Sequence, residues 1–140
     1  MEFTRRETLA LGLGAAALSV LPFRAAQAAT ADELIAEFTG GAVLADAGVT
    51  LTAPEIAENG NTVPIDVSAP GASAILVLAT GNPTPPVATF NFGPLAATQA
   101  ASTRIRLAKT QDLVAIAKLA DGSFAKASAT VKVTIGGCGG

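Results

Sequence analysis

Hydrophobic and polar residues alternate with a period of two along much of the second half of the chain. Between 125 and 135, the odd positions hold alanine, valine and isoleucine, and the even positions hold lysine, serine and threonine. Residues 102–109 behave alike, because Ile105 and Leu107 alternate with Arg104 and Arg106. Successive side chains of a strand point to opposite faces. We therefore predict half-buried strands at 102–109 and 124–135, with Ile135 on the inward face.

Five further segments rich in valine, isoleucine, leucine and threonine lie between turn-forming letters such as ENGN, APGA and GNPTPP. These predicted strands are residues 49–53, 63–68, 74–80, 87–92 and 112–119. Residues 74–80 (AILVLAT) are almost all apolar, which is typical of a central strand covered on both faces. The letters DGS at 121–123 favour a hairpin tip. About seven short strands in roughly 100 residues predict an all-β, immunoglobulin-like β-sandwich.

One helix is expected before the strands, in the segment TADELIAEF at 30–38. Thr30 and Glu33 have the spacing of a capping box, and Leu34, Ile35 and Phe38 fall on one helical face. The following TGG should end the helix. No later segment keeps a 3.6-residue period, so the helix is a short N-terminal addition to the sandwich.

Residues 1–28 resemble an export signal. Arg5 and Arg6 precede a weakly apolar run, LALGLGAAALSVL, and AQA follows at 26–28, so cleavage is expected between Ala28 and Ala29. The 13 apolar-region residues are fewer than the roughly 20 that span a bilayer. We predict a twin-arginine signal, a periplasmic protein without a membrane anchor in its mature form, and a sandwich domain at 29–135. An ordinary secretory signal or a membrane anchor stays open as the alternative.

Composition excludes several classes of function. Removal of residues 1–28 leaves 6 basic against 9 acidic residues, a net charge of −3, so nucleic acid is not an expected partner. The chain has no histidine and one cysteine, which excludes Cys–His and Ser–His–Asp catalysis and the common zinc, copper and haem ligand sets. Glu55, Glu58 and Asp66 are interpreted as solvated turn residues. We expect no metal site and no cofactor of the chain's own.

The sequence ends in GGCGG, with the only cysteine, Cys138, between glycine pairs. Glycine has no side chain to pack and loses the most backbone entropy on ordering. Gly136, Gly137, Gly139 and Gly140 are therefore expected to form a flexible arm, residues 136–140, reaching about 16–18 Å when extended. Such a narrow strip can carry a thiol into a cleft of another protein.

Three readings of Cys138 remain at this point. It can carry a substrate on which other proteins act. It can instead form a disulfide-linked dimer or join an exported β-sandwich interaction module to another chain, because a lone cysteine in an oxidising compartment has no internal partner. A thiol transferase is the weakest reading, since no histidine is present to act as a base.

Several blocks of the chain resemble one family. They are GGCGG (136–140), APEIAENGNTVP (53–64), NPTPPVATF (82–90), STRIRLAKTQ (102–111) and ADGSFAKASATVKVTIGGCGG (120–140). In this order they are similar to SoxY, the sulfur-carrying subunit of the bacterial thiosulfate-oxidising (Sox) system. The resemblance covers essentially the whole expected mature chain.

The resemblance implies a carrier rather than an enzyme. It implies a heterodimer with a SoxZ-like subunit, and a thiosulfate-derived sulfur chain held covalently on Cys138 as an S-thiosulfonate and then a persulfide. A SoxAX-like cytochrome would load the thiol, a SoxB-like dinuclear-metal hydrolase would release sulfate, and a sulfane dehydrogenase would treat the outer sulfur. The haems and metals would belong to those partners.

Overall fold

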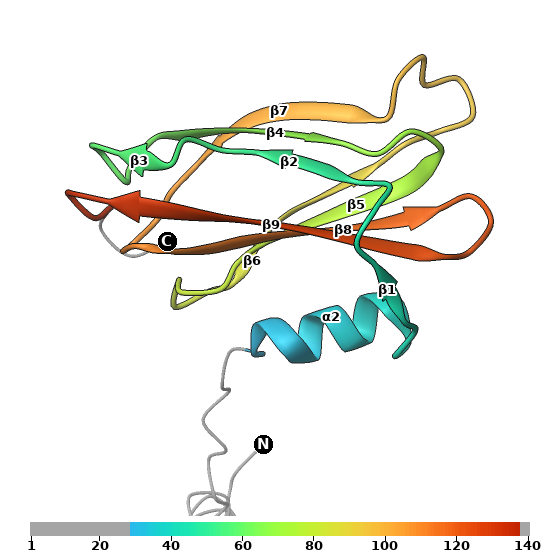
Figure 1. Ribbon diagram of the computed structural model, residues 1–140, viewed down its shortest axis with the longest axis horizontal. Helices are drawn as coiled ribbons and strands as arrows, with labels where there is room; N and C mark the ends of the chain where they lie inside the picture. The colour runs from blue at the N-terminus through green and yellow to red at the C-terminus, as the bar shows by residue number, and fades with distance from the viewer. Residues whose placement is uncertain (1–28, 138–140) are drawn as a thin grey trace, which may run out of the picture.

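The protein is a two-layer β-sandwich with a helix against its outer side (Figure 1). The structure is a computed structural model that describes residues 29–137. The larger sheet has the order β1-β9-β8-β5-β6, with β3 also paired to β9, and the smaller sheet has the order β2-β4-β7. The predicted all-β, immunoglobulin-like sandwich is confirmed.

Nine strands make up the two sheets in the described residues. The larger sheet contains β1 (Leu44–Ala45), β3 (Ile56–Ala57), β5 (Ala72–Ala79), β6 (Pro86–Asn91), β8 (Gln111–Leu119) and β9 (Phe124–Val133). The smaller sheet contains β2 (Thr50–Thr52), β4 (Val63–Ser68) and β7 (Ala100–Ile105). The seven predicted strands correspond to β2 and to β4 through β9. The two-residue strands β1 and β3 were not predicted, and both pair in parallel with β9.

The helix α2 (Ala31–Thr39) begins with the predicted capping box. The Thr30 side chain accepts a hydrogen bond from the Glu33 N–H, and the Glu33 carboxylate accepts one from the Thr30 N–H at 2.8 Å. These hydrogen bonds, with that from the Thr30 backbone the largest cause, lower the pKa of Glu33. Gly40 ends the helix in the left-handed conformation, with φ 64°. No helix in residues 29–137 is long and apolar enough to cross a membrane.

The core fills the space between the two sheets and continues under the helix. Alternate residues of β5 face the two sides: Ile75 and Val77 contact the smaller sheet's residues, and Leu76 and Leu78 pack under α2. Phe38 of the helix meets Phe124 of β9 edge to face, with ring centroids 6.0 Å apart. The predicted central strand is therefore covered on both faces, by the other sheet and by α2 (Figure 1).

Two predicted strands end earlier than expected. β7 ends at Ile105 because the side chain of Asn82 takes the place of a neighbouring strand: it bonds the Arg106 carbonyl and the Ala108 N–H. β9 ends at Val133, and Ile135 is 69% exposed, so its predicted inward position was wrong. Beyond Thr134, which still bonds the Ala57 carbonyl, the chain leaves the strand direction.

The hairpin between β8 and β9 is confirmed at residues 121–123. The Asp121 carboxylate accepts hydrogen bonds from the Ser123 hydroxyl and from the Ser123 N–H. These bonds, with the hydroxyl as the larger cause, lower the pKa of Asp121. Gly122 takes a positive φ of 86°, as a tight turn requires.

Candidate functional site

The structure describes part of the predicted site. Arg5, Arg6, Ala28, Cys138, Gly139 and Gly140 lie outside the described residues. Ala29 is exposed just ahead of α2, while Gly136 and Gly137 are described at the end of β9. The site is therefore built from the residues that hold this end of the chain.

Three segments far apart in the sequence meet there through backbone hydrogen bonds. The Gly60 N–H donates to the Ile135 carbonyl at 2.8 Å, and the Leu107 N–H donates to the Gly60 carbonyl at 2.7 Å. The Gly137 N–H donates to the Leu107 carbonyl at 2.9 Å. We call residues 60, 107, 108 and 135–137 the arm root. Gly137 is buried in it, although it lies only one residue before Cys138.

The arm root requires glycine at two positions because backbones approach closely. A Cβ atom on Gly136 would lie 2.2 Å from the Ala108 carbonyl oxygen. A Cβ atom on Gly60 would lie 2.3 Å from the Leu107 carbonyl oxygen and 2.8 Å from the Gly137 nitrogen. Neither contact can be relieved by rotating a side chain. At these two positions the absence of a side chain lets two backbones lie in contact, whereas the sequence predicted a turn at Gly60 and a flexible arm at Gly136.

The contacts of the sandwich thus extend past the predicted boundary at Ile135. Gly136 and Gly137, expected to belong wholly to a free arm, are held against the loop after β7. These contacts attach the chain to the sandwich as far as Gly137.

The loop that receives Gly137 is itself held by a polar network. Gln111 is 7% exposed; its Nε2 donates to the Asn82 side-chain oxygen at 2.7 Å and to the Lys109 carbonyl at 3.1 Å. Its Oε1 accepts from the Gly81 N–H at 2.8 Å. Asn82 in turn bonds both sides of Leu107, through Arg106 and Ala108. Asn82 and Gln111 therefore fix the loop that carries the acceptor of the Gly137 hydrogen bond.

Sequence reasoning missed these supporting residues. Gly60 in ENGN and Gly81 in GNPTPP were interpreted as simple turn residues. A polar Gln111 at the start of an apolar strand was the one available signal, since buried polar side chains are hydrogen-bonded. Asn82, the side-chain partner of Gln111, lies 29 positions away in the sequence, so the local pattern cannot identify it.

A hollow of about 340 Å³ lies beside the same loop, between β6 and β7, whose facing edges belong to different sheets. Its lining includes Arg104 and Arg106, the side chain of Asn82, and the threonines Thr84 and Thr103. The predicted outward direction of both arginines is confirmed, because both are exposed. The two cationic residues that line this hollow, Arg104 and Arg106, lie close in the sequence to Leu107, whose carbonyl accepts the hydrogen bond from Gly137.

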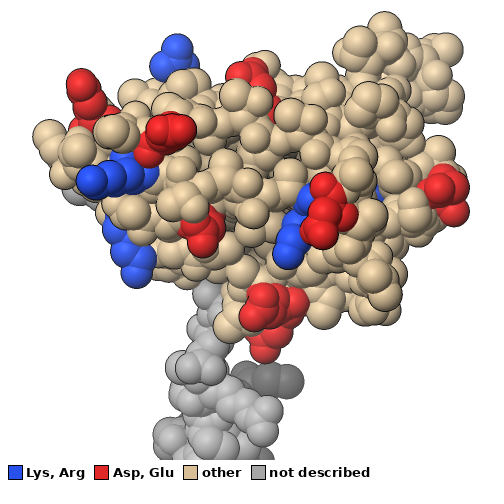
Figure 2. All heavy atoms as spheres, viewed as in Figure 1, with Lys and Arg blue, Asp and Glu red and all other residues tan. Residues whose placement is uncertain are grey.

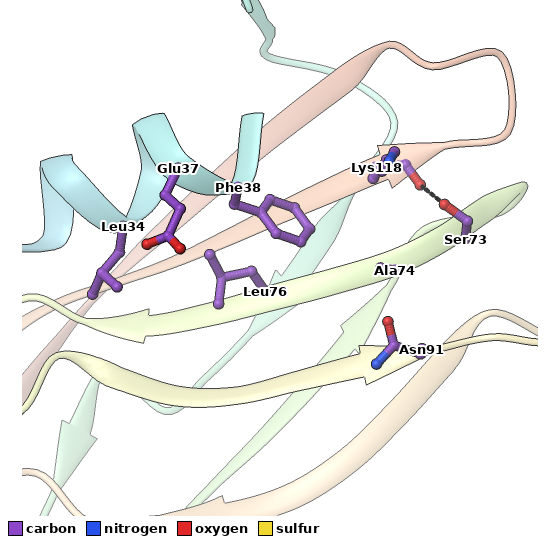
Figure 3. A pocket seen from close by; sticks show the side chains of 8 residues that line it. All are labelled: Leu34, Glu37, Phe38, Ser73, Ala74, Leu76, Asn91 and Lys118. Carbon is purple, nitrogen blue, oxygen red and sulfur yellow. Dashed lines mark hydrogen bonds between the residues drawn. The ribbon is translucent and has the colours of Figure 1, made fainter. Parts of the chain in front are cut away.

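A second hollow, of about 560 Å³, lies between α2 and the outer face of the larger sheet. In Figure 3, Leu34, Glu37 and Phe38 point from the helix toward Leu76, and the Ser73 hydroxyl donates to the Lys118 carbonyl. Lys118 pairs with Phe124 at the hairpin end of β9, opposite the arm root. This hollow therefore lies toward the end of β9 opposite to the arm root.

Several charged groups of residues 29–137 lie at the surface. Glu55, Glu58 and Asp66 are all exposed, as predicted, but Asp66 lies within β4, paired with Ser102 of β7, so its predicted place in a turn was wrong. Figure 2 shows acidic side chains spread over the viewed face, whereas most basic ones lie at the end where β3 and the end of β9 are found. Within residues 29–137, no three His, Cys, Asp or Glu side chains are grouped so that they could hold a metal ion.

Comparison with known proteins identifies the family. A scan of protein-family models matches residues 35–138 to the family described as "Sulfur oxidation protein SoxY". Among solved structures, the sulfur carrier protein SoxY from Chlorobium limicola f thiosulfatophilum is similar, with a TM-score of 0.65 and 37% identity over 74% of this chain and 96% of that one.

A superoxide reductase (neelaredoxin) from Ignicoccus hospitalis shares only the fold. Its TM-score is 0.55, with 21% identity over 62% of this chain and 80% of that one. The search of curated proteins found no match. The resemblance stated from the sequence blocks is thus confirmed by the family match, which spans more than half of the chain: the protein belongs to the SoxY family of sulfur oxidation proteins.

Proposed function

We propose that this chain is a sulfur carrier that holds thiosulfate-derived intermediates covalently on Cys138. The observation that carries the proposal is the arm root: the residue directly before Cys138 is fixed to the sandwich by the Gly137–Leu107 hydrogen bond. Family membership supports the assignment, because the similar structure from Chlorobium limicola is that of a sulfur carrier protein.

The arm root suits a carrier because it combines a defined origin with a narrow tip. Gly137 sets where the terminal residues leave the sandwich, so each partner meets the thiol at a similar place. Cys138, Gly139 and Gly140 follow it in the sequence, and two of these three residues have no side chain. We propose that this tip, rather than all of 136–140, enters the active sites of partner proteins.

The loading step on Cys138 is an oxidation. Its thiol and thiosulfate join as Cys–SH + S₂O₃²⁻ → Cys–S–S–SO₃⁻ + H⁺ + 2 e⁻, so that an S–S bond forms between Sγ and the sulfane sulfur. The two electrons pass to a partner, which we propose is a SoxAX-like cytochrome. The chain has no histidine and only one cysteine, so the redox centre that accepts these electrons is proposed to belong to the partner.

The release step is a hydrolysis. Water converts Cys–S–S–SO₃⁻ into the persulfide Cys–S–SH, sulfate and a proton, and the bond between the sulfane and the sulfonate sulfur breaks. We propose a SoxB-like hydrolase for this step and a sulfane dehydrogenase for the remaining sulfur. A SoxZ-like subunit is the proposed constant partner, and the carrier is proposed to need no cofactor of its own.

Location and export remain part of the proposal. The Arg5–Arg6 pair and the 26–28 AQA sequence support export by the twin-arginine route to the periplasm, with cleavage before Ala29. Export of a folded protein by that route agrees with a carrier that leaves the cell interior already paired with its partner.

The test is thiosulfate oxidation reconstituted with partner proteins from the same cells and either wild-type carrier or the Cys138→Ser variant. We expect full loss of thiosulfate-dependent cytochrome reduction in the variant, with an unchanged unfolding midpoint. Oxidation that continues with Cys138→Ser would refute the carrier role. Wild-type protein found only as a disulfide-linked dimer, inactive as a monomer, would favour the interaction module instead.

A further inference from the structure

We propose that Asn59 is a modification site at which spontaneous deamidation is blocked while the arm root is attached and proceeds when the arm root detaches. Asn59 is exposed, whereas Gly60, the next residue, is buried in the arm root. Asn59 is also the one asparagine of the sequence that a glycine follows. The inference goes beyond the proposed carrier function and does not depend on it, because it concerns the backbone at Gly60.

Deamidation is an attack of the backbone on a neighbouring side chain. The nitrogen of Gly60 would lose its proton and attack Cγ of Asn59, so that a C–N bond forms, the bond between Cγ and Nδ2 breaks, and the side-chain nitrogen leaves as ammonia with that proton. Water then opens the resulting succinimide ring at one of its two carbonyls, which gives aspartate or isoaspartate. Glycine favours the attack because no side chain shields its nitrogen.

The electrophile is prepared by the turn at residues 59–62. The Asn61 N–H donates a hydrogen bond to Oδ1 of Asn59 at 2.9 Å, an arrangement that asparagine side chains favour in turns. A donor placed on this oxygen stabilises the negative charge that develops there as Cγ is attacked. Because Asn59 is exposed, water can reach the ring and ammonia can leave. The side chain of Asn59 therefore meets the requirements of the reaction.

The nucleophile, by contrast, is engaged in the arm root. The Gly60 N–H donates to the Ile135 carbonyl at 2.8 Å, and the Gly60 carbonyl accepts from the Leu107 N–H at 2.7 Å. A Cβ atom on Gly60 would lie 2.8 Å from the Gly137 nitrogen, so other backbone segments surround this residue closely. A buried, hydrogen-bonded amide loses its proton only when the structure opens locally, which is also the requirement for amide hydrogen exchange. Deamidation of Asn59 therefore needs the Gly60–Ile135 hydrogen bond to open.

The isoaspartate product should keep the arm root detached. In isoaspartate the main chain runs through the side-chain carbons, which adds one carbon–carbon bond of about 1.5 Å to the backbone. The insertion falls between two attachments to the end of β9: the Ala57 carbonyl accepts from the Thr134 N–H at 3.0 Å, and the Gly60 N–H donates to the Ile135 carbonyl. Because both attachments cannot keep their spacing, isoaspartate at position 59 should break the Gly60 contacts. Deamidation thus acts as an irreversible switch from the attached to the detached state.

The first experiment compares native and unfolded wild-type protein, so that it depends on no variant. Protein expressed from the full sequence and purified in its native assembly is kept at neutral pH, with and without unfolding concentrations of urea. Peptide mapping by mass spectrometry then separates the asparagine, aspartate and isoaspartate forms of the peptide that contains residue 59. We expect deamidation to be at least roughly tenfold slower in the native protein, and slower by the same factor as hydrogen exchange of the Gly60 amide.

Variants test whether the arm root provides this protection. Gly136→Ala, whose Cβ would lie 2.2 Å from the Ala108 carbonyl oxygen, displaces the chain at Ile135 and should accelerate deamidation of Asn59 roughly 5- to 30-fold. Gly93→Ala is the matched control, since its Cβ would meet nothing within 4 Å, and should keep the wild-type rate. Asn59→Gln/Gly136→Ala should stay unmodified, because glutamine would have to close a larger ring.

Equal rates in native and unfolded wild type would overturn the inference, and so would equal rates in Gly136→Ala and Gly93→Ala. The switch is tested on wild-type protein that contains isoaspartate, which ion-exchange chromatography enriches by its additional negative charge. Its Gly137 amide should exchange roughly 5- to 30-fold faster than in unmodified protein, whereas Asn59→Asp, which adds the charge without lengthening the backbone, should keep the unmodified rate. An unchanged Gly137 rate in the isoaspartate form, or an equal increase in Asn59→Asp, would contradict the switch.

Discussion

Replacing Gly136 by alanine should detach the arm root while leaving the sandwich folded. The new Cβ would lie 2.2 Å from the Ala108 carbonyl oxygen, against an ordinary contact limit of 3.4 Å. The end of the chain must therefore shift by about 1 Å or more, and the 2.9 Å hydrogen bond from Gly137 to Leu107 would exceed ordinary hydrogen-bond length. The loss of one such bond costs about 1 kcal/mol, and a buried carbonyl left without a donor adds to it.

We expect Gly136→Ala to destabilise the attached state of the arm root by about 1–2 kcal/mol relative to the detached state. This corresponds to an increase of roughly 5- to 30-fold in the population of the detached state. Amide hydrogen exchange reports this opening residue by residue. In Gly136→Ala, the Gly137 amide should exchange faster by that factor, whereas amides of the central strand β5 keep their rates. Gly93→Ala is the matched control, because its Cβ would meet nothing within 4 Å. A Gly137 amide that exchanges equally fast in wild type and Gly136→Ala would refute the attachment.

Three further changes test the same region. Gly60→Ala places a Cβ 2.3 Å from the Leu107 carbonyl oxygen, so overpacking should lower the free energy of unfolding by about 1–3 kcal/mol in urea titrations; a loss no larger than that of Gly93→Ala would contradict the close approach. Gln111→Ala removes the buried partner of Asn82 and Gly81, and should cost about 1–3 kcal/mol by the same measurement; an unchanged midpoint would show that the network does not hold the loop. Gly139→Val widens the proposed tip, so Cys138 should react normally with a small thiol reagent while turnover by partner enzymes slows; wild-type turnover would remove the steric argument.

The sequence pattern was sufficient for the main strands and the helix because each has its own periodic signal. The capping residues Thr30 and Glu33 bond as their spacing predicts, and the apolar β5 is covered on both faces. β1 and β3 have two residues each and no periodicity of their own. They form because both can pair with the edge of β9 that β8 does not occupy. Such pairing is set by tertiary structure rather than by local propensity.

The site was predictable only in its chemistry. Cys138 stands out as the sole thiol, and its position between two glycine pairs is visible in the sequence. The close approach of Gly60 and Gly136 to residues 107 and 108 is not visible in the sequence, because glycine occurs both in flexible segments and where two backbones lie in contact. The hollow that contains Arg104 and Arg106 arises where β6 and β7 of different sheets face each other, and the alternation of polar residues gives only their outward direction.

The carrier assignment is tested most directly by the intact mass and peptide mass spectra of the protein isolated, without reductant, from cells oxidising thiosulfate. We predict masses increased by one sulfur atom or by a thiosulfate-derived group, located on Cys138 and missing from Cys138→Ser. An unmodified thiol or a simple disulfide dimer as the only species in such cells would contradict it.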